Sequence, residues 1–216
     1  MRFSTILFDL DGTLIDSAPD LLGAMNTLLA EIGRRPLQKP EFRRMIGEGA
    51  VKLVQRALAA TGRADNARKL THRYLEIYDR RVLESTRPYP GVEEMLPRMA
   101  ACATLALCTN KPIGPTRQIV HKLGWSDHFS MLLGGDSLPT RKPAPEMVLH
   151  ILAQVGADAS SAVLVGDSPA DAGAAAAAGI PFVAVNWGYS REPVSGLGAI
   201  AVVKAVKDLE RVLKDA

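Results

Sequence analysis

Near the start of the chain, residues 3–13 read FSTILFDLDGT, an apolar run that ends in two aspartates and a glycine. The stretch Ser4–Leu10 has the length and residue types of a buried strand. Alternation along a strand places the side chains of Asp9 and Asp11 on one side, and Gly12 lets the backbone turn sharply. Two carboxylates this close need a cation or a shared proton. A simpler interpretation is a strand end followed by a turn, which aspartate and glycine also favour.

Short apolar runs alternate with longer helical patterns along the rest of the chain, and this alternation predicts an α/β fold with a parallel sheet. In such a sheet, ligands bind beyond the carboxyl ends of the strands. Further strands are expected at Ala103–Cys108, Met131–Gly134, Ala162–Gly166 and Pro181–Asn186, with a weaker edge strand within Val194–Val203. Helices are expected near Gly91–Ala101, Gly114–Leu123, Pro143–Val155, Pro169–Ala178 and Lys204–Lys214.

The alternation breaks at residues 16–86, where hydrophobic residues recur with the helical period and no strand is predicted. This segment holds 13 Lys and Arg against 9 Asp and Glu, a charge of +4, which leaves −1 of the total +3 for the rest. We therefore expect a catalytic core of residues 1–15 and 87–216 and an inserted helical unit at residues 16–86. The charge suits a lid over an anionic substrate, and a solvated helical surface explains it equally well.

Composition narrows the class of protein. The 216 residues are 47% hydrophobic and 23% charged, as in an ordinary globular chain. A net charge of +3 without a polybasic run gives no reason to expect nucleic-acid binding. No apolar stretch reaches the ~18 residues of a membrane span, and early aspartates replace the apolar run of a signal peptide. We expect a cytoplasmic protein that binds neither nucleic acid nor membrane, with Cys102 and Cys108 as free, buried thiols. No pattern predicts an oligomeric state.

Polar side chains also follow other predicted strands. Thr109 and Asn110 come directly after the strand at 103–108, where a hydroxyl and an amide can hold a ligand. Lys142 stands immediately before an expected helix, and the free N–H groups at a helix start favour anions. Simpler interpretations are a strand-end hydroxyl for Thr109 and an exposed cation for Lys142.

A second acidic pair, Asp167 and Asp171, follows the strand at 162–166. Ser168 and Pro169 are suited to begin a helix as N-cap and first-turn proline, and Asp171 would complete a capping box. Capping explains Asp171 without catalysis but leaves Asp167 unexplained, because Ser168 already caps the helix. Four such motifs at successive strand ends predict a functional site at one edge of the sheet.

Taken together, the motifs resemble those of the haloacid dehalogenase superfamily phosphatases. The resemblance covers essentially the whole chain, and the helical insert is similar to the superfamily's smaller cap domain. It implies a Rossmann-like parallel sheet core with an inserted α-helical cap domain. The matching motifs are DxDGT at 9–13, Thr109-Asn110, Lys142 and GDSxxD at 166–171, in the superfamily's order.

Other segments resemble the phosphoglycolate phosphatase branch of this superfamily. The glycine-rich segment Ile46–Ala50 is similar to a part of that branch's cap. The remaining segments are RPYPG at 87–91, LCTNKP at 107–112, GGDSLPTRKPAP at 134–145 and Trp187-Gly188-Tyr189. By this resemblance, the expected substrate is 2-phosphoglycolate.

The resemblance also implies a role for each acidic residue. Asp9 is the expected nucleophile, which forms an aspartyl phosphate, and Asp11 is the expected acid and base. These two and Asp167 would bring three acids together around Mg²⁺, with Asp11 contributing its main-chain carbonyl. Asp171 would orient Lys142 or metal-bound water.

The phosphate is expected to lie among residues of the first three motifs. Thr109 and Lys142 would hold the phosphoryl oxygens, and Lys142 would also neutralise the nucleophile. Gly12, Thr13 and Asn110 are the other residues that the resemblance places at the phosphate.

Several functions remain open at this stage. Asp11 argues against a dehalogenase, because dehalogenases of this fold lack an acid/base aspartate two residues after the nucleophile. A sugar-phosphate phosphatase, a pyrophosphatase and a β-phosphoglucomutase-like mutase share the scaffold. A phospho-aspartate receiver module is the alternative outside the enzymes, although the long insert and the DGT motif count against it. The charge of the insert favours a substrate that carries a carboxylate beyond its phosphate. Its candidate selecting residues, which are equally surface charges, are Arg43, Arg44, Glu48 and Lys52.

Overall fold

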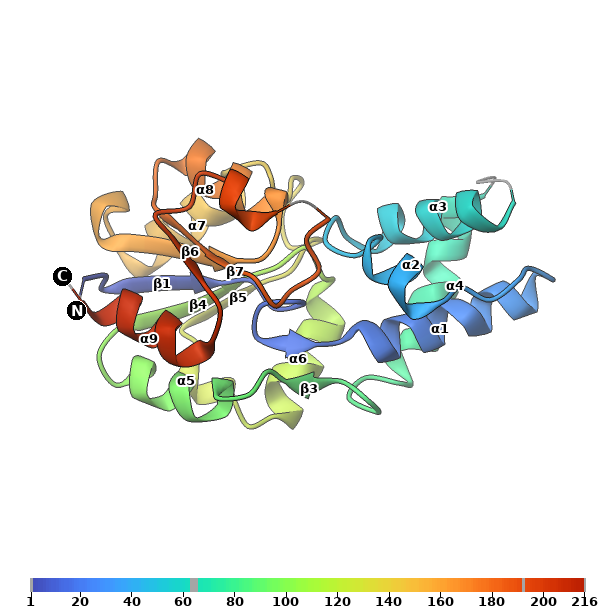
Figure 1. Cartoon of the computed structure of the whole chain (residues 1–216), viewed down its shortest axis with the longest axis horizontal. Helices are drawn as coiled ribbons and strands as arrows, with labels where there is room; N and C mark the ends of the chain where they lie inside the picture. Colours follow the sequence, from blue (N-terminus) through green and yellow to red (C-terminus); the bar gives the residue numbers. More distant parts are fainter. Residues whose placement is uncertain (1, 63–65, 192, 216) are drawn as a thin grey trace.

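The computed structural model describes residues 2–62, 66–191 and 193–215. Its centre is a six-stranded sheet in the order β5-β4-β1-β6-β7-β8, in which every neighbouring pair is parallel (Figure 1). The predicted α/β fold with a parallel sheet is therefore confirmed. The strands are β1 (Thr5–Phe8), β4 (Thr104–Cys108), β5 (Met131–Leu133), β6 (Ala162–Gly166), β7 (Phe182–Val185) and β8 (Ala201–Val203).

Helices cover both faces of this sheet (Figure 1). Alternation along β1 separates the two sides: Ile6 and Phe8 pack into one hydrophobic cluster, and Leu7 packs into the other. Because both faces are covered, β1 and β6 are buried at every position. The first cluster includes α5 (Val92–Ala100), α6 (Ile113–Lys122) and α9 (Val206–Lys214), and the second includes α7 (Glu146–Val155) and α8 (Pro169–Ala178).

Four helices of the insert gather at the carboxyl end of the sheet (Figure 1). Helix α4 packs against both α1 and α3. A short antiparallel ladder, β2 (Ile15–Asp16) with β3 (Arg87–Pro88), joins the insert to the core. The sequence predicts no strand here, because two-residue strands are too short to show a period. The helices are α1 (Ala18–Glu31), α2 (Lys39–Arg43), α3 (Ala50–Thr61) and α4 (Ala67–Asp79), and residues 63–65 of the insert lie outside the described residues.

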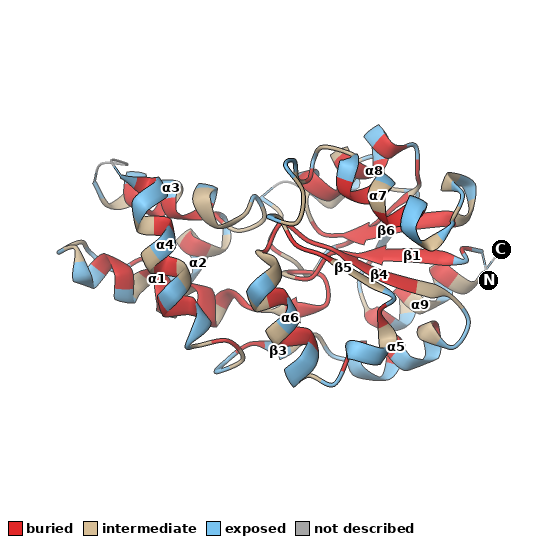
Figure 2. Ribbon diagram, turned by 180° about the vertical axis from the view of Figure 1, so that it is seen from behind, coloured by how far each residue is buried: buried red, intermediate tan, exposed pale blue. Residues whose placement is uncertain are grey.

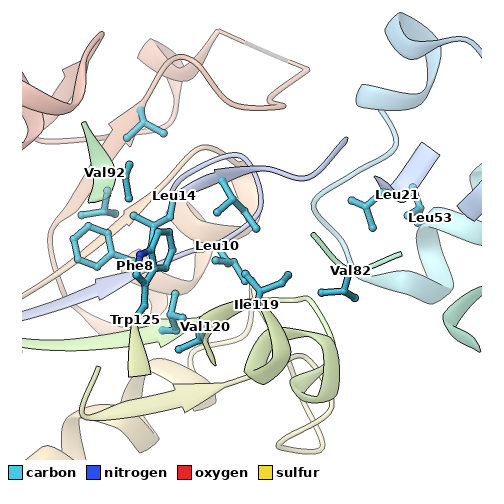
Figure 3. Close-up of a cluster of buried hydrophobic side chains, with 14 of the residues drawn as sticks. Phe8, Leu10, Leu14, Leu21, Leu53, Val82, Val92, Ile119, Val120 and Trp125 are labelled. Carbon is cyan, nitrogen blue, oxygen red and sulfur yellow. The ribbon is translucent and has the colours of Figure 1, made fainter. Parts of the chain in front are cut away.

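One hydrophobic cluster extends from the sheet into these helices. Figure 3 shows Phe8 and Trp125 on the side of the sheet, and Leu21 and Leu53 on the side of the helices. Buried residues accordingly run through the sheet and along the inner sides of the helices (Figure 2). This shared apolar contact holds the four helices over the carboxyl end of the sheet.

Two expectations about the core are wrong. Helix α7 begins at Glu146 rather than at Pro143, so Lys142 does not directly precede a helix. Pro145 disfavours helical backbone at the residue before it, which delays the start of the helix. Cys102 is exposed, because it lies in the turn that leaves α5, whereas Cys108 is buried in β4 as expected. The other predicted strands and helices of the core appear within two residues of their expected ends, and β8 lies within Val194–Val203.

No helix in the described part of the chain is both long enough and apolar enough to span a membrane.

Candidate active site

Three adjacent strands bring the predicted motifs to one edge of the sheet. Asp9 directly follows β1, Thr109 follows β4 and Asp167 follows β6, and β1 lies between the other two strands. The chain runs from β1 to β4 on one side and reaches β6 on the other. Ligands of open α/β sheets bind at such a reversal of strand order.

Asp9, Asp167 and Asp171 form a carboxylate cluster: all three are buried, and one oxygen of each lies within 4.8 Å of the others. The Nζ of Lys142 lies 2.8 Å from Oδ1 of Asp9 and 2.5 Å from Oδ1 of Asp171. Three carboxylates and one ammonium leave a formal charge of −2 in this buried site. The structure therefore brings Asp9, Lys142, Asp167 and Asp171 together.

Burial dominates the protonation equilibria of the cluster. It raises the pKa of Asp9 to about 6, although the neighbouring charge of Lys142 lowers it in part. Burial, followed by the charges of Asp171 and Asp9, also raises the pKa of Asp167. For Lys142, burial by itself lowers the pKa, but the charges of Asp171 and Asp9 outweigh it, and the net direction is upward. The lysine therefore stays charged between the acids.

Asp171 has two structural roles. The hydroxyl and the N–H of Ser168 donate to its Oδ2 at 2.6 and 3.0 Å, and these bonds form part of the predicted capping box of α8. Its Oδ1 accepts a hydrogen bond from Lys142. The capping prediction is confirmed, and the same carboxylate also fixes the ammonium of Lys142 beside Asp9.

Two glycines leave room for the carboxylate of Asp167. A Cβ on Gly12, whose φ is +89°, would lie 2.5 Å from Oδ2 of Asp167. A Cβ on Gly188 would also come closer than 3.0 Å to this carboxylate, which accepts a hydrogen bond from the N–H of Tyr189. No motif in the sequence predicts a role for Gly188, and its one signal is its place in the Trp187–Tyr189 segment after β7.

The carboxylate of Asp11 does not join those of Asp9 and Asp167, although the sequence predicts that these three acids meet. This carboxylate lies outside the cluster of Asp9, Asp167 and Asp171. Both of its oxygens are 3.1 Å from Nζ of Lys111, and Oδ1 also accepts a hydrogen bond of 2.6 Å from the hydroxyl of Ser17. These two partners hold the side chain of Asp11 apart from the cluster. The proposed ligand role of its main-chain carbonyl stays a prediction.

Sequence reasoning missed Lys111. This lysine is 5% exposed, and besides its pairing with Asp11 its Nζ lies 4.5 Å from the ring centroid of Tyr78 in α4. The signal available in the sequence is a lysine placed directly after the Thr109-Asn110 pair at a strand end.

Asn110 holds two backbone segments together. Its side-chain amide donates to the carbonyls of Gly47, at 3.1 Å, and of Lys142, at 2.9 Å. The amide therefore ties the glycine-rich segment to the loop that carries Lys142. The Oδ1 of Asn110 and the Oγ1 of Thr13 are buried without a hydrogen-bond partner among the described residues. The phosphate-binding roles of both residues stay predictions.

A cavity of about 40 Å³, here called the Asp9 cavity, lies between the core and the helical insert. Among the described residues that line it, Lys111 alone carries a positive charge, although the insert as a whole is basic. Arg43, for example, donates instead to the carbonyl of Gly188, at 3.3 Å. The residues that line the Asp9 cavity are Asp9, Asp11, Thr109, Asn110, Lys111 and Pro112 from the core, with Leu21, Ile46, Gly47, Gly49, Ala50, Leu53, Tyr74, Leu75 and Tyr78 from the insert.

None of the described residues that line the Asp9 cavity is a lysine or arginine of the insert, so at this cavity the basic charge does not act as a lid over an anion. The four proposed selecting residues, Arg43, Arg44, Glu48 and Lys52, do not line the Asp9 cavity. Arg43 donates to the carbonyl of Gly188 in the core, and Glu48 pairs with Arg56 and lines a second cavity beside Asp167.

The carboxylate cluster fits a divalent cation. Its donors are oxygen atoms, which Mg²⁺ prefers, and its formal charge of −2 matches that of such an ion. Burial is the largest cause of the raised pKa of Asp9 and of Asp167, and the charge of Asp171 adds to it. A bound cation would offset both effects.

Known proteins resemble this chain over most of its length. The chain is 45% identical over 205 residues to the phosphoglycolate phosphatase of Rhodospirillum rubrum, covering 91% of this chain and 85% of that protein. It is 41% identical to that of Caulobacter vibrioides, covering 96% and 90%. A crystal structure of a predicted phosphoglycolate phosphatase from Haemophilus somnus has a TM-score of 0.93 and 30% identity, covering 99% of each chain.

The sequence profile of the haloacid dehalogenase-like hydrolases matches residues 6–185. The predicted resemblance to this superfamily and to its phosphoglycolate phosphatases is thus confirmed, as is the prediction of an enzyme rather than a receiver module. On this profile and these relatives, with the four motifs gathered at one sheet edge, the chain belongs to the haloacid dehalogenase-like hydrolases.

Proposed function

We propose that this protein is a Mg²⁺-dependent phosphatase that hydrolyses 2-phosphoglycolate to glycolate and phosphate. One observation carries the proposal. The carboxylate of Asp9 is buried and lies 2.8 Å from the ammonium of Lys142, and Asp9 lines the same cavity as Asp11 and Thr109. A nucleophilic carboxylate, a neutralising cation and a second acid are the groups that phosphoryl transfer through an aspartyl phosphate requires.

In the first step, an oxygen of Asp9 attacks phosphorus and the bond from phosphorus to the ester oxygen breaks. Asp11 donates its proton to that leaving oxygen, so glycolate departs as an alcohol. In the second step, Asp11 takes a proton from water, which attacks phosphorus and breaks the bond to Asp9. Phosphate leaves, and both aspartates return to their starting states.

The charges around Asp9 support these steps. Lys142 lowers the pKa of Asp9 against the effect of burial and is proposed to bind the phosphoryl oxygens. Asp9, Asp167 and the main-chain carbonyl of Asp11 are the proposed Mg²⁺ ligands, with Asp171 positioning Lys142. When bound, the ion would supply positive charge that stabilises the negative charge of the phosphoryl group.

The choice of substrate rests on charge and on relatives. Besides the acids Asp9 and Asp11, the described lining of the Asp9 cavity carries the ammonium of Lys111, which favours a phosphomonoester with a second anionic group. Relatives at 45% and 41% identity are named phosphoglycolate phosphatases. Thr109, with Gly12, Thr13 and Asn110, is proposed to surround the phosphate.

The proposal extends to the organisation of the chain. We take residues 16–86 as a cap over a catalytic core of residues 1–15 and 87–216, and the β2–β3 ladder as the connection between them. Asp20 in α1 supports this connection, since its buried carboxylate accepts three hydrogen bonds of 2.7–2.9 Å from Ser85 and Thr86. The proposed setting is the cytoplasm, with a small phosphorylated molecule as substrate and neither nucleic acid nor membrane as partner.

A phosphatase panel tests the function. With Mg²⁺, 2-phosphoglycolate should exceed glucose 6-phosphate and pyrophosphate in kcat/KM. EDTA should abolish turnover, and Ca²⁺ should restore it poorly because its looser coordination misplaces the nucleophile. A tenfold preference for a sugar phosphate, about 1.4 kcal/mol of transition-state energy, contradicts the substrate but not the phosphatase. Failure to hydrolyse any phosphomonoester with Mg²⁺ contradicts the phosphatase itself.

A further inference from the structure

We propose that Lys111 is the receptor for a carboxylate on the substrate, and that Asp11 occupies this receptor until the substrate arrives. The inference rests on the proposed phosphatase function and deepens it, because it assigns the choice of substrate to a core residue. The ligand class is a short phosphomonoester with a carboxylate beside the ester carbon.

The argument begins with the charges in the Asp9 cavity. The phosphoryl group is expected at Asp9, so the rest of the substrate is expected against the other residues that line the Asp9 cavity. The insert lines that space with apolar side chains, glycines and tyrosines. Among the described lining residues only Lys111 can neutralise a second anionic group.

Neighbouring residues hold both the backbone and the ammonium of Lys111 in place. Its N–H donates to Oγ1 of Thr109 at 3.3 Å, and its carbonyl accepts from the N–H of Gly135 at 2.8 Å, so the backbone is held on both sides. The ring of Tyr78 stabilises the ammonium from one direction. A receptor that is positioned before binding loses little conformational entropy when the ligand arrives.

The partner of Lys111 can be exchanged. A buried ammonium needs an anion, and both carboxylate oxygens of Asp11 now meet that need at 3.1 Å. A substrate carboxylate offers the same two oxygens. When the substrate carboxylate takes over Lys111, Asp11 keeps the hydroxyl of Ser17 as a partner and loses its ammonium. It then takes up a proton from water and approaches the ester oxygen as the acid. Binding of the remote carboxylate is thereby coupled to the step in which Asp11 acts.

A set of three phosphomonoesters, each with two carbons beyond the ester oxygen, tests the inference. At the end away from the phosphate, 2-phosphoglycolate carries a carboxylate and O-phosphoethanolamine carries an ammonium. Ethyl phosphate is neutral at this end. Wild-type protein should prefer 2-phosphoglycolate over ethyl phosphate by about 100-fold in kcat/KM and should act most slowly on O-phosphoethanolamine. Equal rates with 2-phosphoglycolate and ethyl phosphate overturn the inference and leave the phosphatase in place.

Substitution of the lysine is the second arm. In Lys111→Met, which keeps most of the side-chain volume, the ratio of kcat/KM values should fall to about 5 or less, mainly through the KM for 2-phosphoglycolate. Lys111→Arg keeps the charge and should recover part of the ratio. The matched control is Lys207→Met, on the exposed side of α9, which should leave the ratio unchanged. A parallel loss with both substrates in Lys111→Met means that the lysine only positions Asp11, and this overturns the inference.

Binding gives a readout that needs no turnover. Calorimetric titration of Asp9→Asn protein, with and without Lys111→Met, measures Kd for 2-phosphoglycolate and ethyl phosphate. The inference requires a tighter Kd for 2-phosphoglycolate that Lys111→Met removes, and an unchanged difference refutes it. If wild-type protein hydrolyses no phosphomonoester, the proposed function fails while this measurement still decides the role of Lys111.

Discussion

The ammonium of Lys142 lies 2.8 Å from the carboxylate of Asp9, and both side chains are buried. The pair itself is neutral, but Asp167 and Asp171 lie beside it and bring the cluster of four to a formal charge of −2. One lysine therefore stabilises three acids, and the balance of the site depends on it.

Replacing this lysine should affect both activity and folding. Lys142→Met leaves three buried carboxylates without an ammonium, so we expect kcat to fall by about 10²–10³-fold and the free energy of unfolding by about 3–5 kcal/mol. Steady-state kinetics at saturating Mg²⁺ and urea unfolding measure the two effects. Lys207→Met, which removes an exposed lysine, should change neither. A kcat within threefold of wild type would contradict the role of Lys142.

Asp9→Asn should abolish turnover and preserve the fold. The amide has nearly the same volume, but it lacks the attacking charge and one proposed metal ligand. We expect less than a few per cent of wild-type kcat, measured in protein shown by mass spectrometry to be free of the deamidated product. Circular dichroism serves as the folding control. Higher residual activity in such protein shows that another group attacks phosphorus.

The pH dependence of stability follows from the buried acids. Burial raises the pKa of Asp9 from 3.8 to about 6, so the folded chain keeps a proton that the unfolded chain releases. Between these pH values the unfolded chain binds fewer protons, and the free energy of unfolding must fall as pH rises. Asp167 acts in the same direction.

We therefore expect metal-free protein to melt several degrees lower at pH 7 than at pH 5. The drop should be smaller in Asp9→Asn and smaller in the presence of Mg²⁺. Thermal melting in EDTA and in excess Mg²⁺ checks this. A drop of equal size in wild type and Asp9→Asn would show that Asp9 is not its source.

The parts of the site that depend on strand ends were predictable. Asp9, Thr109 and Asp167 each follow a strongly apolar run, and the carboxyl ends of parallel strands necessarily meet at one edge. The helix cap at Ser168 was equally readable, because capping depends on neighbours three residues apart. Such features are local in sequence, and their geometry follows from strand and helix periods.

The parts that depend on partners distant in sequence were not predictable. The pairing of Lys111 with Asp11 joins residues 100 positions apart, and no period in either segment encodes it. The sequence shows that the insert is basic, but a count of charges does not show where the side chains point. Arg43, for example, donates to the carbonyl of Gly188. The β2–β3 ladder pairs two residues with two, which is too short for a pattern.

Gly188 has no side chain, and this leaves space for the carboxylate of Asp167. A Cβ at this position would come closer than 3.0 Å to the Asp167 carboxylate, so Gly188→Ala must displace a proposed metal ligand. We expect the Mg²⁺ concentration for half-maximal activity to rise by about 10–100-fold, with a smaller change in kcat at saturating Mg²⁺. Gly196→Ala is the matched control, because a Cβ there meets nothing within 4 Å and neither glycine has a left-handed φ. A Mg²⁺ titration of Gly188→Ala that overlays the Gly196→Ala curve would show that Asp167 does not need its present position to hold the ion.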